Sequence, residues 1–326
     1  MSGYPVKVAI LLICWYDKKM LKKSPKNECH SGFVAIIGPT NAGKSTLLNT
    51  IMGRKVSIVS HKVQTTRTLL RAVKMAGETQ MVFVDTPGIF KPARRLDSAM
   101  VKSAKDSMTD ADAVVVLIDA AHGITETTEG IVSGLPKPGG KGAIPIFAAI
   151  NKVDLVPKAE LLPLAKRLSE LYDFAEIFMI SATDGTGIEP MLKSLAAVMP
   201  KSPYLFDPKD AVEVPDELWL AEITREKIYR FAHKELPYRI HVSTDEIKMA
   251  DDGVADISQT IYVQSTGHKK IIIGKDGAQL KRIGTLARRE IQDEWDIKAR
   301  LKLFVRIEDW ENKAEHYESQ GLKYVS

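Results

Sequence analysis

The sequence of 326 residues has few cysteines and no hydrophobic run long enough to cross a membrane. Its two cysteines, Cys14 and Cys29, belong to no Cys-x-x-Cys pair and to no histidine–cysteine cluster with zinc spacing. This excludes a disulfide framework and predicts a reducing, cytoplasmic setting. The apolar run from Val6 to Tyr16 is shorter than the roughly 20 residues of a membrane-spanning helix.

The excess of one sign of charge over the other is also small. The chain carries 46 lysines and arginines against 41 aspartates and glutamates, which gives a net charge of +5 and a pI of about 8.9. A balance this mild indicates a polyanionic partner only where the basic residues cluster. Apolar residues make up 44% of the chain, as in soluble globular proteins, and the length suggests two domains.

Apolar segments alternate with helical patterns between Phe33 and about Met199. The segments predicted as strands are Phe33–Ile37, Leu69–Met75, Met81–Val84, Val114–Ile118, Ile144–Ala149 and Ile177–Ile180. Near-continuous runs of valine, isoleucine and phenylalanine are typical of buried parallel strands. We therefore expect a doubly wound α/β domain with a mostly parallel sheet, which binds its ligand at the carboxyl ends of the strands.

The segment Gly38–Ser45, between a predicted strand and a predicted helix, matches the phosphate-loop pattern Gly-x-x-x-x-Gly-Lys-Ser/Thr. Its glycines let backbone N–H groups point at phosphate oxygens, and the helix dipole adds to the attraction. Lys44 is placed to reach the β- and γ-phosphates, and the Ser45 hydroxyl to bind Mg²⁺. The residues expected to bind the nucleotide here are Gly38, Asn41, Ala42, Gly43, Lys44, Ser45 and Thr46.

A second motif, Asp85-Thr86-Pro87-Gly88, follows the predicted strand Met81–Val84. A carboxylate at a strand end beside a phosphate loop can hold Mg²⁺ through water. We therefore expect Asp85 to be a metal ligand, and Gly88 to bring its N–H close to the terminal phosphate.

A third motif, Asn151-Lys152-Val153-Asp154, predicts recognition of guanine. The Asp154 carboxylate can accept hydrogen bonds from guanine N1–H and its exocyclic amine, whereas adenine would leave this charge unpaired. The aliphatic stem of Lys152 can cover the base. The backbone of Ser181 and Ala182, which follow another predicted strand, could meet the carbonyl oxygen of the base.

In order and spacing, these motifs resemble those of the Ras-like superfamily of GTP-binding domains. The resemblance implies that Ser60–Arg67 is a switch loop and that the segment after Gly88 is a second one. It also implies that Thr66, or the adjacent Thr65, closes on Mg²⁺ and the γ-phosphate. Lys44, Thr66 and Gly88 would then be the groups that act in catalysis.

Two residues bear on the rate of hydrolysis. Ile89 stands where Ras has the glutamine that orients the attacking water, so intrinsic hydrolysis should be slow or assisted. Asn41 resembles the asparagine with which some translation-factor-class GTPases hold K⁺ against the phosphates. The alternative is that Asn41 caps its own loop.

The pattern changes after Met199. A polar stretch containing Pro200, Pro203, Pro208 and Pro215 predicts a semi-rigid linker. A new unit then follows, with a helix over Asp216–Ala232, strands over Arg239–Met249 and Asp256–Ser265, a long helix to about Trp295, and a strand over Lys302–Ile307.

The run Ile271–Gly277 contains two glycines that bracket Lys275 and open a helix. Such a loop can approach a phosphodiester backbone closely, and the apolar residues before it suit unstacked bases. Basic residues cluster around it, so the positive charge lies where a nucleic acid would bind. The residues expected to contact RNA are Lys269, Ile273, Gly274, Lys275, Asp276, Gly277, Lys281 and Arg282.

With its helix–strand–strand–helix–helix–strand order, this unit resembles a KH domain, a small α+β module that binds about four nucleotides. A Ras-like domain followed by a KH domain resembles the Era family of bacterial GTPases, over roughly residues 30–310. The resemblance implies GTP, GDP and Mg²⁺ as ligands, with K⁺ as an open question. It further implies binding to the 3′ end of 16S ribosomal RNA, a role in maturation of the small ribosomal subunit, and loose contact with the inner membrane.

The expected layout is an unassigned extension over residues 1–30, a Ras-like domain over 31–200, a linker over 201–215, a KH domain over 216–310 and a polar tail over 311–326. We expect a monomer in the cytoplasm. Three alternatives stay open: an RNA-modifying GTPase, which would need a reactive cysteine or another domain; an ATP-dependent phosphoryl-transfer enzyme; and a scaffold tethered to the membrane through Val6–Tyr16.

Overall fold

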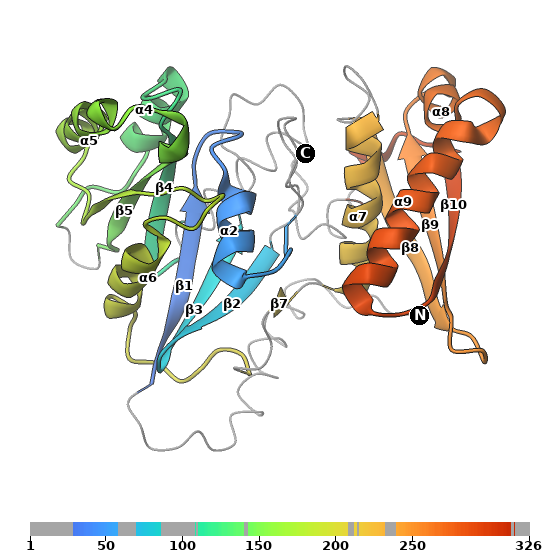
Figure 1. Cartoon of the computed structure of the whole chain (residues 1–326), viewed down its shortest axis with the longest axis horizontal. Helices are drawn as coiled ribbons and strands as arrows, with labels where there is room; N and C mark the ends of the chain where they lie inside the picture. Colours follow the sequence, from blue (N-terminus) through green and yellow to red (C-terminus); the bar gives the residue numbers. More distant parts are fainter. Residues whose placement is uncertain are drawn as a thin grey trace.

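Two separate sheets organise the chain (Figure 1). The fold is taken from a computed structural model that describes residues 29–57, 70–85, 108, 110–139, 143–207, 212–213, 215–231, 239–313 and 316. Within these residues, a seven-stranded sheet occupies the N-terminal domain and a three-stranded sheet the C-terminal one. The predicted division into an α/β domain and a smaller α+β domain is confirmed.

The large sheet has the strand order β6-β5-β4-β1-β3-β2-β7. Its strands are β1 (His30–Ile37), β2 (Leu70–Ala76), β3 (Thr79–Asp85), β4 (Ala113–Asp119), β5 (Ile146–Asn151), β6 (Ile177–Met179) and β7 (Val212–Glu213). Strand β1 pairs in parallel with β3 and β4, and β5 pairs in parallel with β4 and β6. Strand β2 is antiparallel to β3 and β7, so the sheet is mostly parallel, as predicted.

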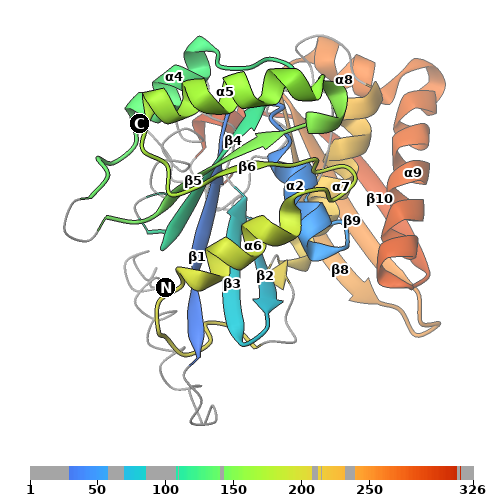
Figure 2. The ribbon, with the colours of Figure 1, turned by 60° about the vertical axis from the view of Figure 1, so that its left-hand side comes forward.

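Helices cover both faces of this sheet, which is why its central strands β1, β4 and β5 are largely apolar. All seven residues of β4 are buried. One core joins the sheet to α2 (Lys44–Met52) and α6 (Ile188–Ala197), and the other joins its opposite face to α4 (Glu126–Ser133) and α5 (Lys158–Leu171) (Figure 2). Alternate residues of β1 enter opposite cores, with Ile36 in the first and Ile37 in the second. This arrangement fixes the strand ends that carry the predicted motifs.

The segment between the domains takes part in the first fold. The Gln80 side chain accepts hydrogen bonds from the backbone N–H groups of Leu205 and Phe206, at 2.7 and 3.0 Å. Farther along, β7 pairs with β2. The sequence predicted a linker here because prolines dominate it, but the structure shows that parts of the linker are bound to the large sheet.

Within the described residues, α-helices of the second domain pack on one face of its sheet. In chain order it consists of α7 (Asp216–Phe231), β8 (Ile240–Met249), β9 (Ala255–Val263), α8 (Thr266–Ile273), α9 (Ala278–Trp295) and β10 (Ala299–Ile307). The sheet order is β10-β9-β8, with β9 antiparallel to β8 and parallel to β10. Its cores lie between the helices and one face of the sheet, so the predicted helix and strand order is confirmed.

Residues beyond β10 fold back onto the second domain. Trp310 is fully buried, and its indole N–H donates to the backbone oxygen of Arg239 at 3.4 Å. The ring of His316 is 8% exposed and packs edge-on against Tyr262. The sequence placed a polar tail from residue 311 onward, but the packing of this domain extends at least to His316.

Candidate nucleotide site and nucleic-acid interface

The phosphate loop connects β1 to α2 and has the backbone shape that its glycines allow. Gly43 has φ = 99°, and a Cβ there would lie 2.3 Å from the Asn151 amide nitrogen. Only glycine fits that position without displacing Asn151. Lys44 is 7% exposed, and its ammonium donates to the backbone oxygens of Gly38 at 3.1 Å and Pro39 at 2.8 Å. The lysine therefore lies folded along the loop that is expected to receive the phosphates.

The Asn151 side chain ties three parts of the site together. Its amide nitrogen donates to the Ala42 backbone oxygen at 2.8 Å, and its amide oxygen accepts from the Ala182 N–H at 2.9 Å. The Thr50 hydroxyl of α2 in turn donates to the Ala182 backbone oxygen at 2.5 Å. Asn151 was predicted to contact guanine, but the structure shows it holding the phosphate loop against the segment Ser181–Ala182. Its amide group has a second N–H that could still reach a base.

A residue that the sequence analysis missed orients Lys152. Asp119, the last residue of β4, accepts from the Lys152 ammonium at 2.6 Å, from the Ala121 N–H at 2.9 Å and from His122 Nδ1 at 2.9 Å. Burial raises the pKa of Asp119, but these hydrogen bonds outweigh it and hold that pKa below its ordinary value. The sequence feature that could have identified Asp119 is its position at the end of a buried strand, where it is the register partner of Asn151.

The remaining predicted base contacts lie at the same edge of the sheet. Asp154 is exposed in a short 3₁₀ turn (Val153–Leu155) after β5, so its carboxylate is open to a base. Ser181 is 1% exposed and begins the segment after β6. Asn41 is exposed with φ = 62°, a left-handed conformation that asparagine tolerates. The structure therefore brings the base motifs and the phosphate loop together.

The predicted metal ligands are placed only in part. Ser45 and Thr46 are half-buried in the first turn of α2, and Asp85 ends β3 beside Ile36 of β1. Thr65, Thr66, Gly88 and Ile89 lie outside the described residues, so the switch threonine stays a prediction. Among the described residues, no group of three or more histidine, cysteine or acidic side chains could hold a metal ion alone.

The predicted RNA loop separates α8 from α9. Gly274 ends α8 with φ = 73°, and its N–H donates to the Lys270 backbone oxygen at 2.8 Å. A Cβ there would meet Gln279 Cβ at 2.6 Å, so a side chain would force the loop away from α9. Lys275 and Asp276 are exposed at its tip. The tight turn thus presents backbone and a cation to the solvent.

A shallow cavity lies against this loop. It measures about 290 Å³, and its lining residues are Thr266, Lys269, Lys270, Ile273 and Gly274. The cavity thus brings Lys269, Ile273 and Gly274 together, while their contact with RNA stays a prediction. Lys281 is exposed on α9 outside this lining. The Arg282 guanidinium lies over the Phe231 ring, 4.2 Å from its centroid, so it also packs the two helices together.

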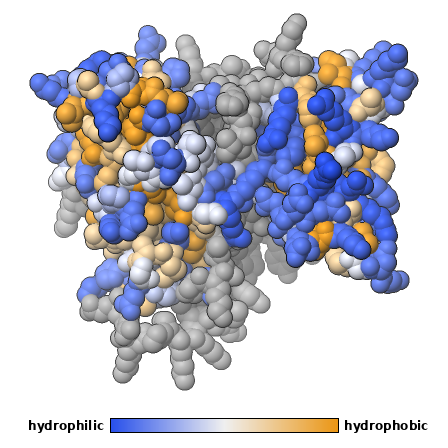
Figure 3. All heavy atoms as spheres, in the orientation of Figure 1, coloured by the Kyte–Doolittle hydropathy of each residue, from blue (hydrophilic) through white to orange (hydrophobic). Residues whose placement is uncertain are grey.

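Ion pairs connect the two domains. Lys55, just after α2, contacts the carboxylates of Glu226 on α7 and Glu290 on α9. Lys227 also pairs with Glu290. Burial alone would lower the pKa of Lys55, but its hydrogen bonds to the two glutamates hold that pKa above the ordinary value. On the face of the molecule shown in Figure 3, polar side chains gather over α7 and α9.

Comparison with known proteins assigns both domains. Residues 33–152 match a family described as 50S ribosome-binding GTPase, and residues 235–312 match the KH domain family. GTPase Era of Afipia carboxidovorans is 45% identical over 304 residues, which cover 92% of this chain and 97% of that protein.

Two solved structures are also similar to this chain. One is a single-substitution variant of Aquifex aeolicus Era bound to GDP·AlF4⁻. The other is Era in complex with MgGDPNP and nucleotides 1506–1542 of 16S ribosomal RNA. Each has a TM-score of 0.84 and 36% identity, and covers 90% of this chain and 99% of the solved one.

Proposed function

This chain belongs to the Era family of GTPases, and from that membership we propose a switch that binds the 3′ end of 16S ribosomal RNA and assists maturation of the small ribosomal subunit. It binds GTP and GDP with Mg²⁺ and hydrolyses GTP. The observation that carries the proposal is the ionic contact of Lys55, three residues after the helix that follows the phosphate loop, with the domain that carries the Gly274–Gly277 turn.

Each residue of the nucleotide site has a role that follows from its position. The N–H groups of the phosphate loop and the Lys44 ammonium would neutralise the phosphates, and the Ser45 hydroxyl would hold Mg²⁺. Mg²⁺ supplies charge compensation for the leaving phosphate. Asp154 would select guanine, while Asn151 keeps the loops around it in place. The switch threonine, Thr66 or Thr65, would complete the metal site in the GTP state.

On the RNA side, the Gly274–Gly277 turn would hold the phosphodiester backbone. Its exposed Lys275 supplies a counter-charge, and Lys269 and Ile273 line the adjoining cavity. Because Lys55 lies between α2 and the predicted switch loop Ser60–Arg67, closure of that loop on GTP would shift the ion pairs with α7 and α9. The RNA groove would then be presented in one nucleotide state and withdrawn in the other.

The wider setting of this function is also a proposal. We infer a monomer that acts in the cytoplasm and touches the inner face of the cell membrane peripherally. Among the described residues, no helix is long and apolar enough to cross a membrane. Cell fractionation would test the membrane contact, since a peripheral protein should leave the membranes in high salt.

Co-sedimentation tests the choice of ribosomal subunit. Purified small and large subunits are incubated separately with the full chain and a GTP analogue, and then pelleted. We expect binding to the small subunit, reduced strongly by Gly274→Asp, which places a side chain against Gln279. Binding to the large subunit alone would contradict the proposal and favour the role that the GTPase family description names.

A further inference from the structure

Lys152 is held in an unusual conformation beside the end of another strand. Its backbone is left-handed, with φ = 67° and ψ = 36°, which is costly for a residue that has a side chain. Asp119, the last residue of β4, is the register partner of Asn151. The Ala120 N–H donates to the Asn151 backbone oxygen at 2.8 Å, so the pairing of the two strands continues to the residue before Lys152. Backbone hydrogen bonds of the sheet therefore place Asp119 next to this lysine.

The Asp119 carboxylate is fixed through both of its oxygens. Oδ1 accepts from the Ala121 N–H at 2.9 Å, while Oδ2 accepts from the Lys152 ammonium at 2.6 Å and lies 2.9 Å from His122 Nδ1. The Asp119 side chain is 9% exposed, whereas the His122 ring is 74% exposed. Water can therefore replace the histidine more easily than the ammonium. Burial raises the pKa of Asp119, but its hydrogen bonds hold that pKa below the ordinary value, so the carboxylate is charged at neutral pH.

This contact limits the freedom of the Lys152 side chain. A free lysine samples many rotamers, and ordering such a side chain on a ligand carries an entropic cost. In this chain both ends of the lysine stem are held, the backbone by the turn after β5 and the ammonium by Asp119. The methylene groups between them are left with few conformations. The part of Lys152 that is expected to cover the base is thus ordered before a nucleotide arrives.

We propose that Asp119 is a positioning residue for nucleotide binding, which holds the Lys152 stem over the base and thereby sets how long a guanine nucleotide stays bound. The inference rests on the guanine-nucleotide binding stated above. Lys152 acts on the face of the base, whereas Asp154 acts on its edge. Asp119 would therefore slow the release of purine nucleotides in general and leave the choice of guanine to Asp154.

The release of a fluorescent GDP measures this effect. The full chain is loaded with the labelled GDP in the presence of Mg²⁺, an excess of unlabelled GDP is added, and the fluorescence change gives the dissociation rate. Asp119→Asn removes the charge but keeps an oxygen that can accept from the Ala121 N–H. We expect release to accelerate by about 2- to 10-fold, the equivalent of one long side chain that must be ordered on binding. Asp119→Glu, which restores a carboxylate, should bring the rate back toward the wild-type value.

A double-mutant cycle separates positioning from a general effect on the fold. Lys152→Met keeps an apolar stem but removes the ammonium. If Asp119 acts through this ammonium, adding Asp119→Asn to Lys152→Met should change the release rate by less than about twofold. A fluorescent inosine diphosphate is the second probe, because its base has the same ring face as guanine but lacks the exocyclic amine. Asp119→Asn should accelerate the release of both nucleotides by the same factor.

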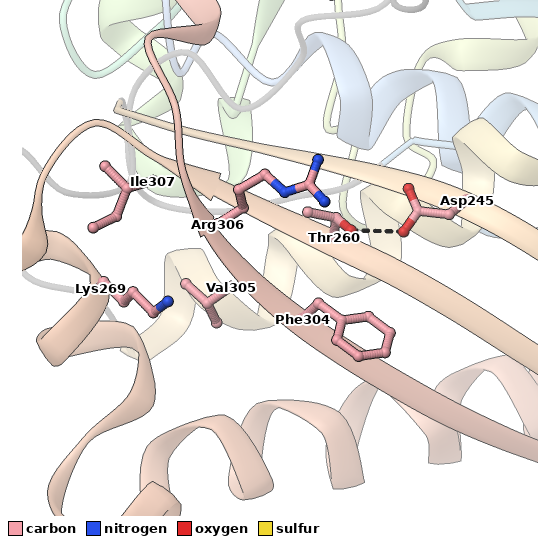
Figure 4. A pocket seen from close by; sticks show the side chains of 7 residues that line it. All are labelled: Asp245, Thr260, Lys269, Phe304, Val305, Arg306 and Ile307. Carbon is pink, nitrogen blue, oxygen red and sulfur yellow. Dashed lines mark hydrogen bonds between the residues drawn. The ribbon is translucent and has the colours of Figure 1, made fainter.

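Two other carboxylates provide matched controls. Asp112 precedes the opposite end of β4 and accepts from the Phe33 N–H at 2.7 Å. Asp245, in the second domain, accepts from the Thr260 hydroxyl at 2.6 Å and lines a cavity of about 630 Å³ (Figure 4). Asp112→Asn and Asp245→Asn each remove one negative charge, as Asp119→Asn does. Both should release GDP within about twofold of the wild-type rate.

Three results would overturn the positioning role. The first is release of GDP from Asp119→Asn at the wild-type rate. The second is that Asp119→Asn and Lys152→Met accelerate release independently, which would assign Asp119 to the fold of its own loop. The third is a different factor for GDP and inosine diphosphate, which would place the effect at the edge of the base. A wild-type chain that bound no guanine nucleotide would instead contradict the proposed function itself.

Discussion

The Lys55 ammonium lies 2.5 Å from the Glu226 carboxylate, across the boundary between the two domains. Lys55 follows α2, whose nine residues begin at Lys44 of the phosphate loop. The Glu226 side chain is 1% exposed on the first helix of the second domain. A helix of this length spans about 13 Å, so the phosphate site and the RNA-binding domain are connected by little more than one rigid element.

Lys55→Met should uncouple the domains. The variant keeps the apolar stem but removes the charge that Glu226 and Glu290 share. We expect the free energy of unfolding to fall by about 1–2 kcal/mol, because a buried carboxylate loses a partner. Urea unfolding measures the loss. Lys193→Met, which breaks an exposed pair with Glu189 on α6, should cost less than about 0.5 kcal/mol, and equal losses in both variants would contradict this account.

Asn151→Ala should weaken nucleotide binding without touching a phosphate contact. The change removes the hydrogen bonds to Ala42 and Ala182 that hold the phosphate loop in place. Two buried hydrogen bonds correspond to about 2–3 kcal/mol, so the dissociation constant for GDP should rise about 30- to 150-fold. Titration with a fluorescent GDP measures it. An unchanged constant would mean that the loop keeps its shape without Asn151.

Asp154→Asn should change the base that is bound. The carboxylate can accept from two guanine donors, whereas an amide presents one acceptor and one donor group. We expect GTP affinity to fall by about 100-fold or more and affinity for xanthosine triphosphate, which has a carbonyl in place of the amine, to rise. Competition titrations measure both. If GTP and ATP bind alike before and after the change, the proposed base recognition is wrong.

The interdomain ion pairs should weaken in acid. Burial alone would raise the pKa of Glu290, but hydrogen bonds from Lys227 and Lys55 hold it below its ordinary value of 4.5. The unfolded chain therefore binds a proton more readily. The stability that Glu290 contributes is complete when the pH is above its ordinary pKa. It is lost as the pH falls through the lower pKa that Glu290 has in the folded chain.

Urea unfolding between about pH 5 and pH 3 checks this. The wild-type chain should lose stability more steeply than Glu290→Gln, which has no charge to protonate. Glu189→Gln, at an exposed site on α6, should follow the wild-type curve. Parallel curves for the wild type and Glu290→Gln would show that Glu290 does not contribute in this way.

The sequence predicted most of the nucleotide site because its motifs are local. Gly38–Ser45 directly follows β1, and Asn151–Asp154 begins at the last residue of β5, so a pattern of neighbouring residues is enough to place them. Asp119 was missed because its role depends on Lys152, which lies just after the adjacent strand β5. The pair of Lys55 and Glu226 was missed for the same reason, since 171 residues separate them.

Other features depend on which face of an element is covered. The sequence predicted a strand over Lys302–Ile307, which contains Phe304, but only the packed helices show that its ring points away from the core. The prolines between the domains predicted a linker, while its attachment to the buried Gln80 of the inner strand β3 depends on where the chain returns to the large sheet. The sequence pattern alone predicts neither the direction of the Phe304 ring nor the attachment of the linker, because both follow from the tertiary fold.

The most direct test of the account measures RNA binding in each nucleotide state. The full chain is titrated with a labelled oligonucleotide from the 3′ end of 16S ribosomal RNA, in the presence of a GTP analogue, of GDP, or of no nucleotide. We expect tight binding only with the GTP analogue in the wild type, and a much smaller difference between states in Lys55→Met. Equal affinity in all three states of the wild-type chain would show that the domains act independently and would contradict the switch.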